Sequence, residues 1–239
     1  MVTDAPAVET EAKLRASRRA FRALAAQEVL EDDQGASWRV VQRRDLSLRD
    51  TYWDTPDGRL ARANGTLRVR EHGDDTPAEL TLKGPLPRQA NQGATAGWSR
   101  TELTVAVPGD SGPADWAQLP QTEPVITALQ DLGVDRSEVG SGVAGLSQLR
   151  ADIVLLNPRR DMLLERDGQQ CVLSLDEVRI EGQPYARRYV EIELKHGPAT
   201  AVDRLAGALA QRYGLRPSRQ AKVAAARAWL AKRRASTIT

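Results

Sequence analysis

Val190-Glu191-Ile192-Glu193-Leu194-Lys195 places an apolar residue at every second position and a charged residue at each position between. Successive side chains of a β-strand point to opposite faces of a sheet, so this alternation predicts a strand with one apolar and one charged face. Two glutamates on one face repel each other unless a cation or a basic group lies between them. The stretch therefore predicts a sheet whose charged face needs counter-ions.

The same alternation recurs along the rest of the chain. Near the N-terminus, Glu9, Glu11 and Lys13 share the face opposite Ala12 and Leu14. Four more stretches oppose charged to apolar residues: Leu67-Arg68-Val69-Arg70, Leu80-Thr81-Leu82-Lys83, Glu102-Leu103-Thr104-Val105 and Leu173-Ser174-Leu175-Asp176. A solvated face is one interpretation, as in any half-buried antiparallel sheet. The repeated Glu-x-Glu followed by lysine favours a different interpretation, in which the face turns inward and holds water, metal and a charged ligand.

The remaining patterns predict an α+β fold with about eight strands and helices at both ends of the chain. The strands are expected at 8–14, 38–48, 66–71, 78–83, 99–107, 150–156, 159–166, 170–180 and 185–195, with a short extended stretch at 51–53. The helices are expected after Ser17 and at 123–132, 199–213 and 218–234, with loops at 84–98 and 135–147. No long linker divides the chain, so we expect residues 1–239 to form one domain.

Composition restricts the classes of function. Thirty-four Lys+Arg and 32 Asp+Glu leave a net charge of +2, which does not favour a nucleic-acid or membrane partner. Cys171 is the single cysteine, so an intramolecular disulfide is excluded and a reducing compartment is the simpler interpretation. The N-terminus has no signal-peptide pattern, and no apolar run approaches a membrane span. These features predict a cytoplasmic protein.

A charged cavity of this kind has recognisable chemistry. Clustered carboxylates are hard oxygen ligands that suit Mg²⁺ or Mn²⁺. Arginine and lysine beside them suit a polyanion, and arginine binds phosphate oxygens in a bidentate manner. Active sites for phosphoryl transfer combine a metal with basic side chains, because catalysis of this reaction is mostly positioning and charge stabilisation.

Two motifs resemble a known family. Glu9-Thr10-Glu11-Ala12-Lys13 matches the Glu-x-Glu-x-Lys signature of the CYTH, or triphosphate tunnel metalloenzyme, family. Tyr52-Trp53-Asp54-Thr55-Pro56-Asp57, continuing through Leu60 to Leu67-Arg68-Val69-Arg70, resembles a second and more specific stretch of that family. The resemblance covers residues 8 to about 230. It implies an eight-stranded antiparallel β-barrel, open as a tunnel, with helices packed outside.

The resemblance also implies roles for individual residues. It implies metal ligation by Glu9, Glu11, Glu102, Asp176, Glu191 and Glu193, and phosphate binding by Lys13, Arg68, Arg70 and Lys83. The family has a further tunnel arginine, for which Arg150, Arg159 and Arg160 compete; strand alternation favours Arg159, with Arg160 second. It also has a lysine in a late helical segment, where Lys222 fits and Arg219 is the substitute.

The expected reaction is hydrolysis of inorganic triphosphate to pyrophosphate and phosphate with Mg²⁺ or Mn²⁺. Glu9, Glu11, Lys13 and Glu193 are the expected catalytic residues, and Glu193 is a candidate to activate the attacking water. Thiamine triphosphate is a rival substrate whose organic tail would need an aromatic mouth, for which Trp38, Trp53 and Trp98 are candidates. A class IV-type adenylate cyclase and a polyphosphate- or nucleotide-binding module without turnover are two further candidate functions. The oligomeric state, monomer or homodimer, stays open.

Overall fold

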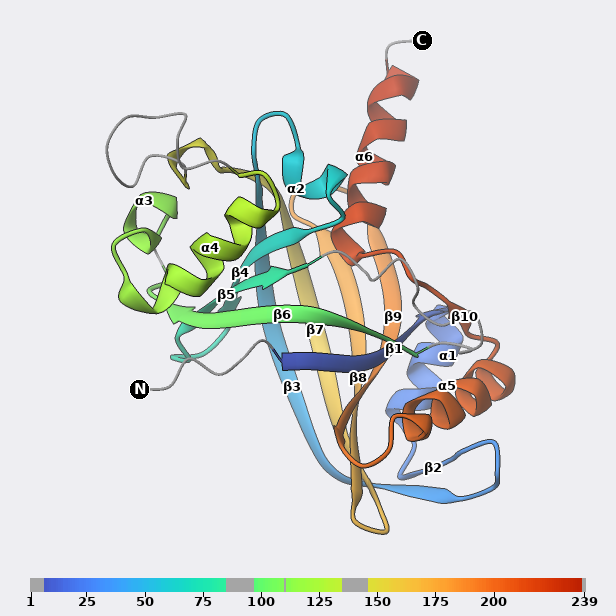
Figure 1. The fold of residues 1–239 in the computed structure, drawn as a ribbon. Coiled ribbons are helices and arrows are strands. Elements are labelled where there is room, and N and C mark those ends of the chain that lie inside the picture. Colours follow the sequence, from blue (N-terminus) through green and yellow to red (C-terminus); the bar gives the residue numbers. More distant parts are fainter. Residues whose placement is uncertain (1–6, 85–96, 110, 135–145, 238–239) are drawn as a thin grey trace.

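The fold is an antiparallel sheet that curves into a tunnel-like barrel (Figure 1). The computed structural model describes residues 7–84, 97–109, 111–134 and 146–237. Its strands are β1 (Ala7–Ala16), β2 (Val29–Glu31), β3 (Ser37–Asp54), β4 (Thr66–His72), β5 (Ala78–Lys83), β6 (Gly97–Val107), β7 (Arg150–Arg166), β8 (Gln169–Ile180), β9 (Ala186–His196) and β10 (Arg216–Pro217). Its helices are α1 (Arg18–Ala25), α2 (Arg59–Arg62), α3 (Pro113–Trp116), α4 (Glu123–Asp131), α5 (Thr200–Tyr213) and α6 (Lys222–Thr237), with 3-10 turns η1 (Pro120–Thr122) and η2 (Leu146–Gln148).

Eight of the strands follow one another in the order β1-β6-β5-β4-β3-β7-β8-β9. The path returns to its first strand because β1 pairs with β6 through Ala7–Ala12 and with β9 through Glu11–Ala16. The two short strands are additions at the margin, since β2 pairs with β3 and β10 with β1. The expected antiparallel β-barrel with outer helices is confirmed.

The apolar face of the strands lies outward, under the helices. Leu14, Leu173 and Ile192 are fully buried in a cluster that includes Leu24 of α1 and Leu205 of α5. A second cluster joins Leu67 and Leu80 of β4 and β5 to α3 and α4. Burying such a side chain contributes about 1.5–3 kcal/mol, so the helices shield the outer face and leave the polar face to line the interior.

A third apolar cluster connects α6 to the barrel. Val223 and Ala226 of α6 are buried with Tyr52, Leu155 and Tyr189 of the barrel strands. These contacts bring the N-terminal end of α6 against the barrel, which is the end that carries Lys222. Among the described residues, no helix combines the length and the apolar character needed to span a bilayer.

Several predicted elements have different bounds. The stretches 150–156 and 159–166 were expected to be separate strands around Asn157-Pro158, but they form the single strand β7, because β3 and β8 continue beside it past Pro158. The cap predicted at Ser17 is confirmed, as its hydroxyl accepts the Ala20 N–H at 3.1 Å. Helices α2 and α3 and strands β2 and β10 were not predicted; each is two to four residues long. Most of the expected loops at 84–98 and 135–147 lies outside the described residues.

Asp54 organises the turn after β3. Its carboxylate accepts the backbone N–H groups of Thr55, Leu60 and Ala61 at 2.8, 2.9 and 3.1 Å. Arg227 of α6 also reaches it, at 3.5 Å. The Asp-Thr-Pro motif therefore fixes the connection between the end of β3 and β4.

We expect Asp54→Ala to lower the free energy of unfolding by about 3 kcal/mol or more, because three backbone donors lose a buried acceptor. Asp57→Ala is the matched control, since the Asp57 side chain is half-exposed and forms surface ion pairs with Arg59 and Arg62. This control substitution should lower the free energy of unfolding by about 1 kcal/mol or less. Urea unfolding of both variants provides the measurement. Equal losses would show that the turn does not depend on Asp54.

Candidate active site

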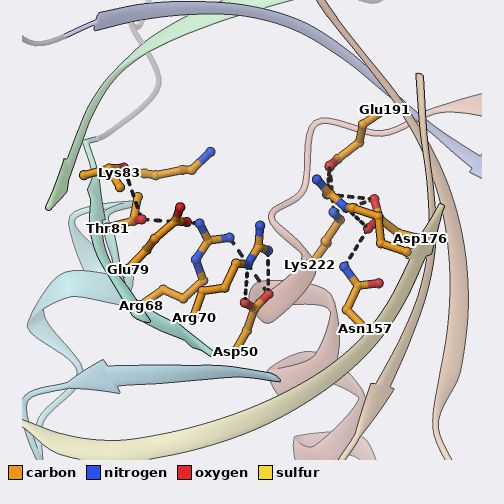
Figure 2. Close-up of polar contacts among 12 residues, drawn as sticks. Asp50, Arg68, Arg70, Glu79, Thr81, Lys83, Asn157, Asp176, Glu191 and Lys222 are labelled. Atoms are coloured by element: carbon orange, nitrogen blue, oxygen red, sulfur yellow. Dashed lines mark hydrogen bonds and ion pairs between the residues drawn. The ribbon is translucent and has the colours of Figure 1, made fainter. Parts of the chain in front are cut away.

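The first polar cluster of the interior gathers around Asp176 on β8. This carboxylate has no exposed surface and accepts hydrogen bonds from Arg159 Nε at 2.7 Å, Lys222 Nζ at 2.8 Å and Asn157 Nδ2 at 2.6 Å. Glu191 on β9 accepts from the same two cations, at 3.0 Å from Arg159 Nη2 and 2.7 Å from Lys222 Nζ. Three strands and the start of α6 thus meet at two carboxylates that share two cations (Figure 2).

Charge pairing keeps this cluster ionised. Burial alone would raise the pKa of Asp176, but the charges of Arg159 and Lys222 outweigh it and hold that pKa well below its ordinary value. Burial and the charge of Asp176 oppose ionisation of Glu191, and Lys222 and Arg159 still lower its pKa. The pKa of Lys222 is raised by the same two carboxylates against its own burial.

The second polar cluster lies on β3 and β4, across the interior in Figure 2. Asp50 accepts a bidentate pair of hydrogen bonds from Arg70, at 2.7 Å from Nε and 2.9 Å from Nη2. Arg68 lies beside them, with Nη1 3.9 Å from Asp50 Oδ2, and its Nη2 donates to Thr81 Oγ1 at 3.4 Å. Burial opposes ionisation of Asp50, yet Arg70 and Arg68 lower its pKa strongly.

A chain of polar contacts extends this cluster to β5 and β6. The hydroxyls of Thr81 and Thr104 are 3.2 Å apart, and Thr104 Oγ1 donates to Glu102 at 3.3 Å. Glu102 in turn pairs with Lys83 at 2.6 Å. Arg68, Lys83 and Glu102 therefore belong to one connected group.

Strand β1 adds two buried charged residues opposite β9. Lys13 is 3% exposed and pairs in register with Glu191, whose pKa it helps to lower. Glu11 is 5% exposed and pairs in register with Glu193. Glu193 is less buried and forms an ion pair with Lys195. Glu9 lies on β1 opposite Arg100, and its side chain falls outside the described part.

Arg160 is not brought into the interior. It lies on the outer face of β7, where it forms a bidentate pair with Asp45 at 2.7 and 2.8 Å, and its side chain is 40% exposed. Neighbouring positions of a strand face opposite ways, so only Arg159 of the two can reach Asp176. Arg150 and Arg219 are exposed. We therefore leave Arg160 out of the proposed site.

Two of the tryptophans considered for an aromatic mouth lie elsewhere. Trp38 is fully buried in the cluster under α1 and α5. Trp53 packs edge-to-face on Trp116 of α3, with ring centroids 5.2 Å apart. The side chain of Trp98 is outside the described residues. Neither Trp38 nor Trp53 is available for an organic tail inside the barrel.

Asp50 and Asn157 are interior residues that the sequence patterns did not single out. A bulge between Val40 and Gln42 shifts the alternation of β3, so that Asp50 faces inward with Tyr52. Asn157 precedes a proline, which is a pattern typical of a turn. The spacing of Asp50 and Tyr52 could have indicated this, because residues two positions apart share a strand face and both precede the Asp-Thr-Pro motif.

The donor chemistry of the interior suits a hard divalent cation. Asp176 and Glu191 converge on one ammonium group, at 2.8 and 2.7 Å from Lys222 Nζ. Carboxylate oxygens are the ligands that Mg²⁺ and Mn²⁺ prefer. No group of three or more Asp, Glu, His or Cys side chains converges within the part of the chain that the structure describes. The interior carboxylates are therefore suitable ligands for Mg²⁺ or Mn²⁺, and Asp176 and Glu191 are two that already share the ammonium group of Lys222.

Comparison with known proteins gives one family. The family model described as the CYTH domain matches residues 7–226 of the chain. No curated protein matches the sequence.

Three solved structures are similar over nearly their whole length. A Bacillus halodurans protein proposed to be an adenylate cyclase has a TM-score of 0.58 at 20% identity, covering 90% of this chain and 94% of its own. HpAC1 from Hippeastrum, for which a dominant triphosphatase activity is described, has a TM-score of 0.55 at 17% identity, covering 92% and 95%. The PH1819 protein from Pyrococcus horikoshii has a TM-score of 0.50 at 18% identity, covering 90% and 96%. At these identities the likeness shows the fold.

We predict that Asp50 makes stability depend on pH in the acid range. Its pKa is lower in the folded protein than in the unfolded chain. Its contribution is therefore fully present above the unfolded pKa of about 4 and is lost as pH falls further.

Urea unfolding of the wild type and Asp50→Asn from pH 7 to pH 3 measures this effect. At neutral pH the variant should be less stable by about 3–5 kcal/mol, because Arg70 loses a buried partner. The difference between the two free energies should begin to shrink as the pH falls below about 4, towards the much lower pKa of Asp50 in the folded protein. A gap that stays constant over the whole range would contradict the assignment of a charged Asp50.

Proposed function

Because the chain belongs to the CYTH domain family, we propose that it is a metal-dependent phosphohydrolase that cleaves a small triphosphate inside its barrel. Inorganic triphosphate, split to pyrophosphate and phosphate, is the proposed substrate. The triphosphatase activity described for HpAC1 guides the choice among phosphate anions. The observation that carries the proposal is the buried interior in which carboxylates and basic side chains of several strands converge.

The free-energy cost of burying charged groups favours a functional role for this interior. Taking an ion out of water costs several kcal/mol even after relaxation, and an apolar replacement of a buried ion pair is often neutral or stabilising. Asp176, Glu191, Arg159 and Lys222 have side chains that are 0%, 14%, 15% and 11% exposed. Burying these four charged groups costs free energy that apolar residues would not cost, whereas the same groups would suit the binding of a charged ligand.

The residues divide into two tasks. Asp176 and Glu191, with Glu9, Glu11, Glu102 and Glu193 as further candidates, would hold Mg²⁺ or Mn²⁺, which when bound neutralises phosphate oxygens and favours attack on phosphorus. Arg68, Arg159, Lys13, Lys83 and Lys222 would bind phosphate oxygens and stabilise the charge of the transition state.

The barrel supplies orientation and a low-dielectric surrounding. Arg159 is fixed by Asp176 and Glu191 before any ligand arrives, so little reorganisation is needed during the reaction. Glu193 lies on the same strand face as Glu191 and is more exposed, which suits it to accept a proton from an attacking water. The in-line water would then approach the terminal phosphorus from the side of β9.

Phosphate release should be measured with inorganic triphosphate, thiamine triphosphate and ATP, each with Mg²⁺, Mn²⁺ or EDTA. We expect metal-dependent release from inorganic triphosphate that is lost in the Glu9→Ala/Glu11→Ala variant. Preference for thiamine triphosphate would change the substrate and keep the reaction. Absence of release from all three, with triphosphate binding unchanged in the variant, would leave a binding module and contradict the proposal.

Adjacent arginines give a matched test of the interior. Arg159→Gln should lower kcat/KM by about 100- to 1000-fold, the usual loss of one preorganised charge contact. Arg160→Gln removes an equally bidentate arginine from the outer face of the same strand and should change kcat/KM by less than about twofold. Similar losses in both variants would show that the loss reflects damage to β7 and would remove Arg159 from the site.

A further inference from the structure

We propose that Asp50 is a positioning residue: it neutralises Arg70, and it thereby leaves Arg68 as the arginine that binds the triphosphate. The inference rests on the proposed function, since it concerns how the same interior holds its anion. It gives different tasks to two arginines of one motif, Leu67-Arg68-Val69-Arg70, that the resemblance treats alike.

Arg70 already has a complete anionic partner. Asp50 and Arg70 are opposite each other in the β3–β4 register, and their side chains are 3% and 11% exposed. Nε and Nη2 of Arg70 both donate to the two oxygens of Asp50, at 2.7 and 2.9 Å. This fork is the geometry in which an arginine would otherwise bind a phosphate, so the carboxylate occupies the place of the anion. Arg159 makes the same fork to Asp176, at 2.7 and 3.1 Å, but Asp176 is a proposed metal ligand that the bound metal would draw away from Arg159, whereas Asp50 has no such role.

Arg68 lacks such a partner at hydrogen-bond distance among the described residues. Its Nη1 is 3.9 Å from Asp50, which is beyond a hydrogen bond, and its Nη2 makes a long bond of 3.4 Å to the neutral Thr81 hydroxyl. Its Nε is buried without a hydrogen-bond partner in the same part of the chain. A buried donor left unsatisfied costs about 1–3 kcal/mol, and an anionic oxygen in the interior would supply the missing acceptor.

The arrangement predicts a distinctive interaction between substitutions. In Arg70→Gln, Asp50 loses its partner and its nearest remaining guanidinium is Arg68, 3.9 Å away. Asp50 would then bind Arg68 and compete with the triphosphate for it. In Asp50→Asn/Arg70→Gln the competing charge is removed, so Arg68 should again be available to the triphosphate. If Arg70 itself contacted the phosphate, this double variant would bind as weakly as Arg70→Gln.

Binding of inorganic triphosphate in EDTA, followed by calorimetry, measures this without turnover. Arg70→Gln should weaken binding by about tenfold or more, and Asp50→Asn/Arg70→Gln should return within about threefold of the wild type. Arg68→Gln and Asp50→Asn/Arg68→Gln should both remain at least about tenfold weaker. Asp45→Asn/Arg160→Gln, which removes the bidentate pair on the outer face, is the matched control and should bind as the wild type does.

A double variant as weak as Arg70→Gln would overturn the inference, as would wild-type binding by Arg68→Gln. If Arg70→Gln does not fold, the double variant removes both members of the pair and keeps their shape, so its binding compared with Arg68→Gln decides the question. Failure of the wild type to bind or hydrolyse any triphosphate would instead refute the proposed function. The two failures are therefore distinguishable.

Discussion

Asp176 is a charged group with no exposed surface, and the rest of the interior depends on how its charge is held. Arg159, Lys222 and Asn157 all donate to it, so the carboxylate joins β7, β8 and the start of α6. Breaking such a pair costs about 3–5 kcal/mol, whereas an apolar replacement of the whole pair would often cost nothing. Stability alone therefore does not account for charges at these positions, and the charged ligand that we propose would account for them.

The interior is asymmetric in a way that fits a metal together with a polyanion. On one side, Asp176 and Glu191 share two cations and their oxygens converge on Lys222 Nζ. On the opposite side, Asp50 forms a bidentate pair with Arg70 and lies 3.9 Å from Arg68. The carboxylates of Asp176 and Glu191 thus lie across the interior from Arg68, as Figure 2 shows, and the Nε of Arg68 is buried without a hydrogen-bond partner among the described residues. A small triphosphate with its metal combines both types of charge.

The alternation of apolar and charged residues predicted the barrel strands and most of the interior face. It placed Arg68, Lys83, Asp176 and Glu191 on the polar side, and it separated Arg159 from Arg160, which pairs with Asp45 outside. Period-two alternation fails where a bulge intervenes, so the bulge near Val40 concealed the inward direction of Asp50. Sequence spacing also carries no information on which ion pairs form, because partners such as Asp50 and Arg70 meet only through strand register. The Asp50–Arg70 pair, on which the proposed competition rests, was therefore visible only in the structure.

A crystal structure with Mn²⁺ and a non-hydrolysable triphosphate analogue tests the central claim most directly. The account predicts an anomalous manganese signal inside the barrel within coordination distance of Asp176 or Glu191. It also predicts phosphate oxygens at hydrogen-bond distance from Arg68, with the Asp50–Arg70 pair intact. Metal and phosphate bound on the outer surface, with the ion pairs of Asp176 unchanged, would contradict it.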